Sequence, residues 1–310
     1  MKKKIFIAGG TGLVGLNLFN ELKKKNYAIN SNYYSKKIIK KNFKFYNFEN
    51  FNDCLKATKK VNVLYILAVK GAGIINLKKN FFNQTRANFL IRYNLLEASR
   101  INKVDKIIWV SSSTVYQPKR SKVKEKELNL NSEPYEIYRG TGWLYRYLEK
   151  LFIYYRDEFK MNINIIRTSS IYGPYDNFDF EKSHVTPALI KKAVDKKKLI
   201  VLGDKKVVRD FVFVKDLVKA ILLISSSRKI KKIINFSSGH PTTIYTLANK
   251  IAKHTKISKI IFKNNKLKSS APYRVLDNKE FNKLFPKFKR TKLDDGLIDT
   301  IKWYNRNKKN

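Results

Sequence analysis

The sequence predicts an α/β protein with a doubly wound parallel sheet and a smaller C-terminal substrate-binding cap. Three observations predict it: a glycine-rich turn follows the first apolar run, strand-like runs alternate with helical stretches over the first half of the chain, and the pattern loosens after Gly173-Pro174. Strands that alternate with helices are typical of βαβ units in one parallel sheet. With 310 residues the chain is long enough for a large α/β domain and a cap.

The elements follow in order along the chain. We expect strands at residues 5–8, 27–32, 61–69, 106–110 and 162–167, and helices at 17–25, 82–100 and 142–159. Each strand is a short apolar run, as expected for strands covered on both faces. Further helices are expected at 187–196 and 243–254, and a strand–helix unit at about 207–225 is expected to return to the main sheet. The predicted domains are therefore 1–172 and 173–310.

Composition supports a folded protein with a strong positive charge. Hydrophobic residues make up 43% of the chain and the formal net charge is +42. Such a charge indicates either a nucleic-acid or membrane partner, or a chain-wide compositional drift toward lysine. Because the lysines are scattered and do not form one block, we favour drift. The charge should still attract anionic substrates.

Cysteine content and apolar runs favour a soluble cytoplasmic protein. Cys54 is the single cysteine, so no internal disulfide can form, and a reducing compartment fits. The basic start at residues 2–4 precedes an apolar run of only four residues, which is too short for a signal peptide. No stretch approaches the ~20 apolar residues of a membrane span, so no membrane partner is expected.

The glycine turn is the strongest motif. Gly9, Gly12 and Gly15 lie in GGTGLVG, directly after the first strand and at the start of a helix. In a Rossmann-type turn the first glycine permits the bend, the second lets the backbone approach a pyrophosphate, and the third allows close helix packing. The amides of Leu13 and Val14 would face the phosphates. We also expect Ala68, Thr168 and Ser170, which follow other strands, to line this dinucleotide site.

The end of the second strand favours NADP over NAD. An NAD site commonly has an acidic residue there to bind the ribose 2′-hydroxyl. Residues 30–37 contain no acid and two lysines, Lys36 and Lys37. Lys36 is predicted to contact the 2′-phosphate of NADP, although the general excess of lysine also explains its presence, and NAD remains the alternative.

Several further segments carry a family resemblance. They are AVKGAG at 68–73, VSSSTVY at 110–116, IYGPYDNFDFEKSHVTPALI at 171–190, RDFVFVKDL at 209–217 and the C-terminal GLIDTIKWY. Together with the glycine turn they resemble the extended short-chain dehydrogenase/reductase superfamily, the NAD-dependent epimerases and dehydratases. The resemblance spans nearly the whole chain. It implies NADP(H) binding, a nucleotide-sugar substrate, and a homodimer packed through two long helices.

The resemblance also implies roles for single residues. Ser112 takes the position of the family serine that hydrogen-bonds the reacting oxygen, and its alternative role is to cap a turn. His184 matches the general acid/base of epimerisation, a task that suits a side chain titrating near neutrality. Thr114 takes the place of the family's second epimerase residue, a cysteine. A threonine hydroxyl is a poor acid or base near pH 7, so two-centre epimerisation is not expected from Thr114 itself.

The family's tyrosine–lysine pair is missing. Constant spacing places Thr141 at the tyrosine position and Tyr145 at the lysine position, where no residue of the segment supplies the lysine's positive charge. Tyr145 lies one helical turn further along the same face and its phenol could point into the site. In a second alignment, residues 135–139 form a Tyr-x-x-x-Arg pair, and Tyr138 could donate a proton from a loop. We rank the constant-spacing alignment first.

The resemblance also makes Arg209, and by analogy Arg274, candidates for binding the nucleotide diphosphate, since guanidinium groups match phosphate geometry. Solvated surface charges are the alternative in so basic a chain. The three histidines and the cysteine show no metal-ligand spacing, and no nucleic-acid-binding motif is present.

The sequence thus predicts an NADP-dependent nucleotide-sugar epimerase/reductase acting on a 4-keto sugar. The alternative is a non-catalytic or chemically altered nucleotide-binding homologue that lacks the Tyr-x-x-x-Lys pair. Nucleic-acid binding through charge ranks third, and it would show affinity that falls steeply with salt.

Overall fold

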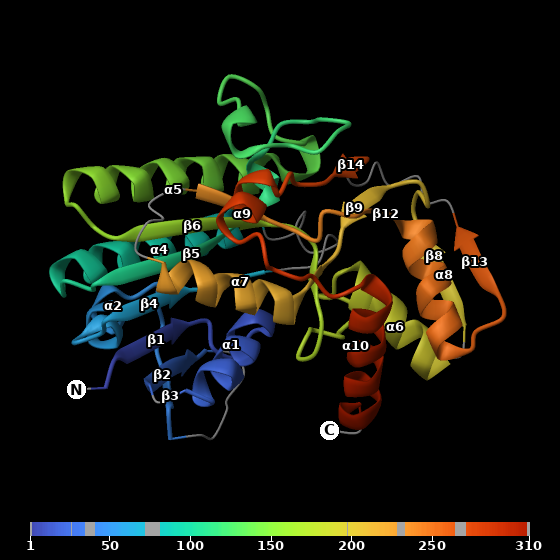
Figure 1. Cartoon of the computed structure of the whole chain (residues 1–310), viewed down its shortest axis with the longest axis horizontal. Helices are drawn as coiled ribbons and strands as arrows, with labels where there is room; N and C mark the ends of the chain where they lie inside the picture. The colour runs from blue at the N-terminus through green and yellow to red at the C-terminus, as the bar shows by residue number, and fades with distance from the viewer. Residues whose placement is uncertain are drawn as a thin grey trace.

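A seven-stranded parallel sheet forms the centre of the molecule (Figure 1). The computed structural model describes residues 2–25, 27–34, 41–71, 81–196, 198–227, 233–263 and 271–308. The strand order is β11-β6-β5-β4-β1-β2-β3, the doubly wound arrangement predicted from the sequence. The strands are β1 (Lys4–Ala8), β2 (Ala28–Tyr33), β3 (Phe43–Phe45), β4 (Val63–Ile66), β5 (Lys106–Ser112), β6 (Ile163–Thr168) and β11 (Ile233–Phe236).

Helices cover both faces of this sheet because its strands are apolar on both sides. In β1, Ile5 and Ile7 pack toward one face while Phe6 and Ala8 pack toward the other. The first face is covered by α1 (Leu13–Lys23), α7 (Val214–Ser226) and α9 (Lys279–Leu284), and the second by α2 (Phe51–Thr58), α4 (Phe81–Ile101) and α5 (Arg139–Glu158). Figure 1 shows α5 and α7 on opposite sides of the strands.

The smaller C-terminal part has its own apolar core. It contains a two-stranded sheet of β8 (Leu199–Leu202) and β13 (Ile260–Lys263), and a three-stranded sheet of β9 (Val208–Asp210), β12 (Pro241–Thr243) and β14 (Tyr273–Arg274). The helices are α6 (Val185–Lys196), α8 (Ile244–Thr255) and α10 (Leu293–Asn307). The pair β7 (Ile171–Tyr172) and β10 (Val212–Phe213) joins the two parts.

The segment expected to return to the main sheet does so differently from the prediction. The helix α7 packs on the sheet, but β9 pairs with β12 and β14, and β10 pairs with β7. The strand that rejoins the seven-stranded sheet is β11, beside β6 and beyond residue 225. The stretch before α7 is too short and polar for a central strand, since Arg209 and Asp210 interrupt its apolar residues. The domain division at residue 172 stays a prediction.

Other expected elements lie where the sequence placed them, with ends shifted by a few residues. The helix expected from residue 142 begins at Arg139, and a short 3₁₀ turn at Glu136–Tyr138 precedes it. The sequence predicted a helix around Cys54 only in general terms and did not predict β3, which is short and has one buried side chain. Cys54 is buried in α2, and burial raises the pKa of its thiol to about 12, so it is an inert core residue.

Candidate active site

The glycine turn has the geometry of a phosphate-binding loop. Gly9 has a φ of +95°, and a Cβ built on it would lie 2.5 Å from the backbone nitrogen of Ala68. A Cβ on Gly15 would lie 2.1 Å from the carbonyl oxygen of Gly9, so helix and turn pack as closely as only glycine allows. By contrast, a Cβ on Gly12 would make only one ordinary contact. Gly12 therefore faces open space, where a ligand's phosphates can approach.

The first turn of α1 can receive an anion. It has no acidic residue, and no side chain caps it. The amides of the first helical turn, including those of Leu13 and Val14, lack intrahelical carbonyl partners and carry the positive end of the helix dipole. The residues present therefore fit the diphosphate of a dinucleotide.

Several buried polar atoms without partners lie at, or directly after, the carboxyl ends of β5 and β6. Buried polar groups normally have hydrogen-bond partners, so a cluster of orphans indicates a place where a polar ligand belongs. Within the described residues, these atoms include Ser113 Oγ after β5, and Thr168 Oγ1 and Ser169 Oγ at and after the end of β6; Asp176 Oδ2, Ser183 Oγ and Arg274 Nε, from other segments, also have no partner. Thr168, one of the predicted cofactor residues, is among them, and a ligand bound at the edge of a parallel sheet would meet it.

The end of β2 is polar and carries no acid. Asn32 accepts a 2.7 Å hydrogen bond from the amide of Gly9 and so ties the strand to the glycine turn. Beyond it, Tyr34 stacks on Phe45 at 5.9 Å between ring centroids, and Lys70 Nζ lies 5.6 Å from the Tyr34 ring. Lys36, the predicted 2′-phosphate contact, lies outside the described residues.

Ser112 lies at the end of β5 and contacts Thr114. Its Oγ accepts hydrogen bonds from the amide of Thr114 at 3.2 Å and from the Thr114 hydroxyl at 3.0 Å. Ser112 therefore caps the 3₁₀ turn Ser113–Val115, as its structural alternative required. Its own proton has no acceptor among the described residues, so it can donate to the oxygen of a ligand.

Four predicted site residues come together from distant parts of the chain: Tyr138 from the turn before α5, His184 from the start of α6, Arg209 from β9 and Arg274 from β14. The guanidinium carbon of Arg274 lies 4.8 Å from the Tyr138 ring centroid. Burial alone would raise the pKa of Tyr138, but the positive charges of Arg274 and Arg209 outweigh it and lower the pKa. The His184 side chain is accessible to solvent. Its pKa is nevertheless lowered, first because neighbouring protein atoms partly desolvate the imidazole and then because Arg274 repels its charged form.

The two arginines form a positive pair. Arg209 donates to the carbonyl oxygens of Val208 at 2.7 Å and Ala271 at 2.6 Å, and Arg274 lies 3.4 Å from the Ser170 hydroxyl. Burial, and then repulsion by Arg274, lowers the pKa of Arg209 to about 10. Among the described residues no carboxylate forms an ion pair with either arginine. Two adjacent guanidinium groups without a counter-ion are suited to a diphosphate.

Tyr145, at the lysine position of the constant-spacing alignment, does not lie beside Tyr138 and the arginine pair. It is buried in the core against Trp109, and its hydroxyl accepts a 2.6 Å hydrogen bond from Arg92. The positive charge beside Tyr145 comes from a different element, because Arg92 lies on α4 and not on α5. Sequence reasoning missed Arg92 because the alignment considered only the α5 segment. A charged residue inside the apolar stretch FLIRYNLL is the signal that could have found it.

In the second alignment, the tyrosine and the arginine of the Tyr-x-x-x-Arg pair have separate partners. The Tyr135 hydroxyl donates a 2.7 Å hydrogen bond to the carbonyl oxygen of Tyr273 and accepts from the amide of Lys119. Arg139 lies at the surface, 3.3 Å from Glu133. Its guanidinium is therefore engaged away from Tyr135, and Tyr138 is the phenol of this segment that lies beside the arginine pair.

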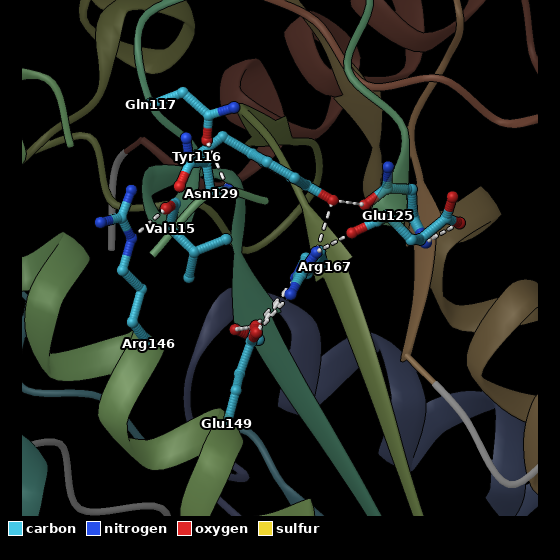
Figure 2. A network of polar contacts seen from close by, with 10 residues as sticks. Val115, Tyr116, Gln117, Glu125, Asn129, Arg146, Glu149 and Arg167 are labelled. Atoms are coloured by element: carbon cyan, nitrogen blue, oxygen red, sulfur yellow. Dashed lines mark hydrogen bonds and ion pairs between the residues drawn. The ribbon is translucent and has the colours of Figure 1, made fainter. Parts of the chain in front are cut away.

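A buried network supports the floor of the site (Figure 2). Arg167 on β6 forms a 2.6 Å ion pair with Glu149 on α5 and donates to the Tyr116 hydroxyl at 2.6 Å. Glu149 also accepts from Ser111 at 2.6 Å, and Tyr116 donates to Asn235 on β11 at 2.7 Å. The network therefore links the middle of α5 to β5 and β6 directly, and to β11 through Tyr116.

The described residues provide neither a metal-binding cluster nor a membrane-spanning helix. Across the described residues no three His, Cys, Asp or Glu side chains are grouped to hold a metal ion. In the same part of the chain, no helix combines the length and the apolar character needed to cross a bilayer.

The fold and this site define a class of protein. Residues 5–237 match the model of the NAD dependent epimerase/dehydratase family. The chain belongs to this family, which confirms the resemblance seen in its sequence.

Particular relatives narrow the class. The chain is 25% identical to the GDP-L-fucose synthase of Escherichia coli, over 99% of this chain and 98% of that protein. It is 28% identical to the Probable GDP-L-fucose synthase 1 of Oryza sativa, over 78% and 76%. The chain is thus an enzyme-family member whose relatives are nucleotide-sugar epimerases and reductases, and the segment 171–190 resembles a GDP-L-fucose synthase signature.

Solved structures share the fold. The UDP-glucose 4-epimerase of Thermotoga maritima, solved with UDP-glucose, superposes with a TM-score of 0.86 at 20% identity, over 98% of this chain and 99% of that one. The GDP-L-fucose synthetase of Naegleria fowleri bound to NADP gives 0.82 at 19% identity, over 100% and 96%. At this identity the likeness establishes the shared fold.

Proposed function

We propose that this protein is an NADP-dependent nucleotide-sugar epimerase/reductase that acts on a 4-keto sugar nucleotide, as a GDP-L-fucose-synthase-like enzyme. The observation that carries the proposal is the pair Arg209 and Arg274, which have no carboxylate partner among the described residues and lie beside His184 and Tyr138. A diphosphate bound to the arginines would bring its sugar to an imidazole and a phenol. Those are the two side chains that proton transfer next to a ketone requires.

The dinucleotide would lie on the glycine turn, where Gly9 and Gly15 allow the turn and helix to pack closely and Gly12 leaves open space for the phosphates. We favour NADP because residues 30–34 offer no acid for a 2′-hydroxyl and Lys36 follows β2 in the sequence. NAD is the alternative cofactor. When bound, the nicotinamide supplies or accepts hydride, and the protein's own residues perform every proton transfer.

Each proton-transfer role follows from the chemistry of its side chain. His184, whose pKa is lowered, is neutral near pH 7 and can remove a proton beside the ketone. Tyr138 can protonate the C4 oxygen, because the arginines stabilise the phenolate that results. Ser112 can donate a hydrogen bond to the same oxygen. Thr114 holds Ser112 in place and does not itself act as an acid or base.

A second candidate function is supported by Tyr145 and Arg139. Tyr145 is buried against Arg92, and Arg139 is paired with Glu133, so neither does the work of the lysine in a Tyr-x-x-x-Lys pair. A non-catalytic or chemically altered nucleotide-binding homologue would show this arrangement too. It would bind dinucleotide and nucleotide sugar but release both unchanged.

We further propose a cytoplasmic homodimer that pairs through α4 and α5. Aromatic side chains are exposed along these two helices, which pack side by side. The exposed members are Phe82, Tyr93, Trp143, Tyr147 and Tyr154. Exposed apolar patches of this kind mark interaction surfaces.

The arginine pair gives a direct binding test. We expect Arg209→Met and Arg274→Met each to weaken binding of GDP or UDP about tenfold or more, because each removes a charge-assisted contact to phosphate. NADPH affinity should stay within about twofold, because the dinucleotide is proposed to lie on the glycine turn, away from the arginines. Isothermal titration calorimetry measures both. The matched control is Arg139→Met, which removes a surface arginine. Unchanged affinity for both nucleotides in the two variants would rule out the arginine pair as the diphosphate site.

A further inference from the structure

Arg92 is a buried cation that has no carboxylate partner in the described part of the chain. It lies in the middle of α4 and is 2% exposed. Its guanidinium donates to the backbone and side-chain oxygens of Asn88, at 2.9 and 3.0 Å, and to the Tyr145 hydroxyl at 2.6 Å. Among the described residues no ion pair involves Arg92, and the remaining ranges contain no Asp or Glu. Burial lowers its pKa, which the phenol of Tyr145 only partly offsets.

Burying the charged guanidinium of Arg92 costs free energy, so its presence in the core needs a physical reason. Isolated buried charges destabilise a fold unless hydrogen bonds satisfy them, and even then an apolar side chain of similar size often serves stability better. Two of the Arg92 nitrogens are satisfied, whereas Nε has no partner among the described atoms. Packing alone is therefore a weak reason for an arginine here.

The contacts of Arg92 lead to the cofactor edge of the sheet. Asn88 bonds both backbone groups of Lys70: its Oδ1 accepts from the Lys70 amide at 3.0 Å, and its Nδ2 donates to the Lys70 carbonyl at 2.9 Å. Lys70 lies in the loop after β4. The same loop touches the glycine turn, since a Cβ on Gly9 would lie 2.5 Å from Ala68 N and 2.7 Å from Leu67 C.

On the other side Arg92 is held by α5. The Tyr145 ring packs on Trp109 at 5.8 Å between centroids, and the Arg92 guanidinium carbon lies 4.8 Å from the Tyr145 ring. Tyr145 occupies the position that constant spacing assigns to the missing lysine. A continuous series of contacts therefore runs from that position through Arg92 and Asn88 to the loop under Gly9.

We propose that Arg92 is a positioning residue for the dinucleotide: held by Tyr145, it fixes Asn88 and thereby the loop after β4 against the glycine turn. The proposal rests on the proposed function, since it needs a dinucleotide on that turn. In this role Arg92 acts through Asn88 and not by contact with the dinucleotide. It replaces from inside the protein the anchoring charge that the absent lysine would bring to the cofactor site.

The test compares NADPH and GDP affinities in the full-length chain. We expect Tyr145→Phe, Asn88→Ala and Arg92→Met each to weaken NADPH binding about tenfold, because each breaks a buried hydrogen bond to a charge or to the loop. GDP affinity should stay within about twofold, since the arginine pair is untouched. Arg92→Lys, which keeps the charge, should recover part of the loss seen in Arg92→Met. The matched control is Tyr245→Phe, the same chemical change on an exposed tyrosine of α8.

The outcomes separate the two proposals. If folded Tyr145→Phe and Asn88→Ala bind NADPH as tightly as the unaltered chain, Arg92 has no positioning role, even where thermal stability falls. An equal loss of NADPH and GDP affinity would contradict the proposal as well, because it indicates general damage. If Arg92→Met does not fold, the two milder variants still decide. Failure of the unaltered chain to bind NADPH would overturn both this inference and the proposed function.

Discussion

At the scale of single residues, the account depends on what one charge does to its neighbours. Arg274 lies against Tyr138 and close enough to His184 to lower the pKa of both. A lowered pKa keeps His184 neutral, and so able to act as a base, further into the acid range. The same charge makes Tyr138 a stronger proton donor but narrows the pH range in which it holds its proton.

The pH profile of catalysis tests this arrangement. For His184 as base, kcat/KM should fall as pH drops through a pKa below its ordinary value of about 6.5. For Tyr138 as donor, kcat/KM should fall as pH rises through a pKa below about 10. Arg274→Met removes the positive charge, so both pKa values should rise and both limbs of the profile should move to higher pH. In the control Arg139→Met both limbs should stay in place. If they also stay in place in Arg274→Met, the charge of Arg274 does not act on His184 and Tyr138.

At the scale of elements, the start of α5 decides which side chains reach the site. The helix begins at Arg139, so Tyr138 lies just before it beside the arginine pair, and Tyr145 points into the core. The opposite face of α5 carries Tyr147 and Tyr154, which are 56% and 55% exposed. One helix thus contributes to the site at its beginning and offers an aromatic surface along its length.

That surface predicts the assembly state. We expect the chain to be a dimer in solution, and Tyr147→Glu combined with Tyr154→Glu to make it a monomer, because two charges on each helix would have to be buried at the interface. Sedimentation velocity measures this. The control is Tyr245→Glu, on an exposed tyrosine of α8. A dimer that survives the double substitution would place the interface elsewhere.

The sequence predicted the fold better than the site. Apolar runs and the glycine turn depend on local pattern, so β1, α1, β5 and β6 lie close to their predicted places. The direction of a side chain depends on where a helix begins and on which elements pack together, and this is tertiary information. For that reason constant spacing selected Tyr145, whereas the structure places Tyr138 beside Arg209 and Arg274. Arg92 was missed because its contacts join α4 to α5 and to the β4 loop.

At the scale of the whole molecule, the candidate site needs both parts of the chain. The main sheet provides the glycine turn, Ser112 and Ser170, while the smaller part provides His184, Arg209 and Arg274. The net charge of +42 adds a general attraction for anionic ligands such as NADP and a nucleotide sugar. Nucleic-acid binding through this charge would instead show a steep salt dependence and no dependence on NADP.

The central claim is that this site performs proton transfer and hydride chemistry on a 4-keto nucleotide sugar. The most direct measurement incubates the protein with NADPH and GDP-4-keto-6-deoxymannose in deuterated buffer, and follows absorbance at 340 nm together with deuterium uptake at sugar C3 and C5. We predict NADPH consumption that is lost in Tyr138→Phe, and deuterium uptake that is lost in His184→Asn. Binding of NADPH with neither signal would contradict the claim and would favour the non-catalytic homologue.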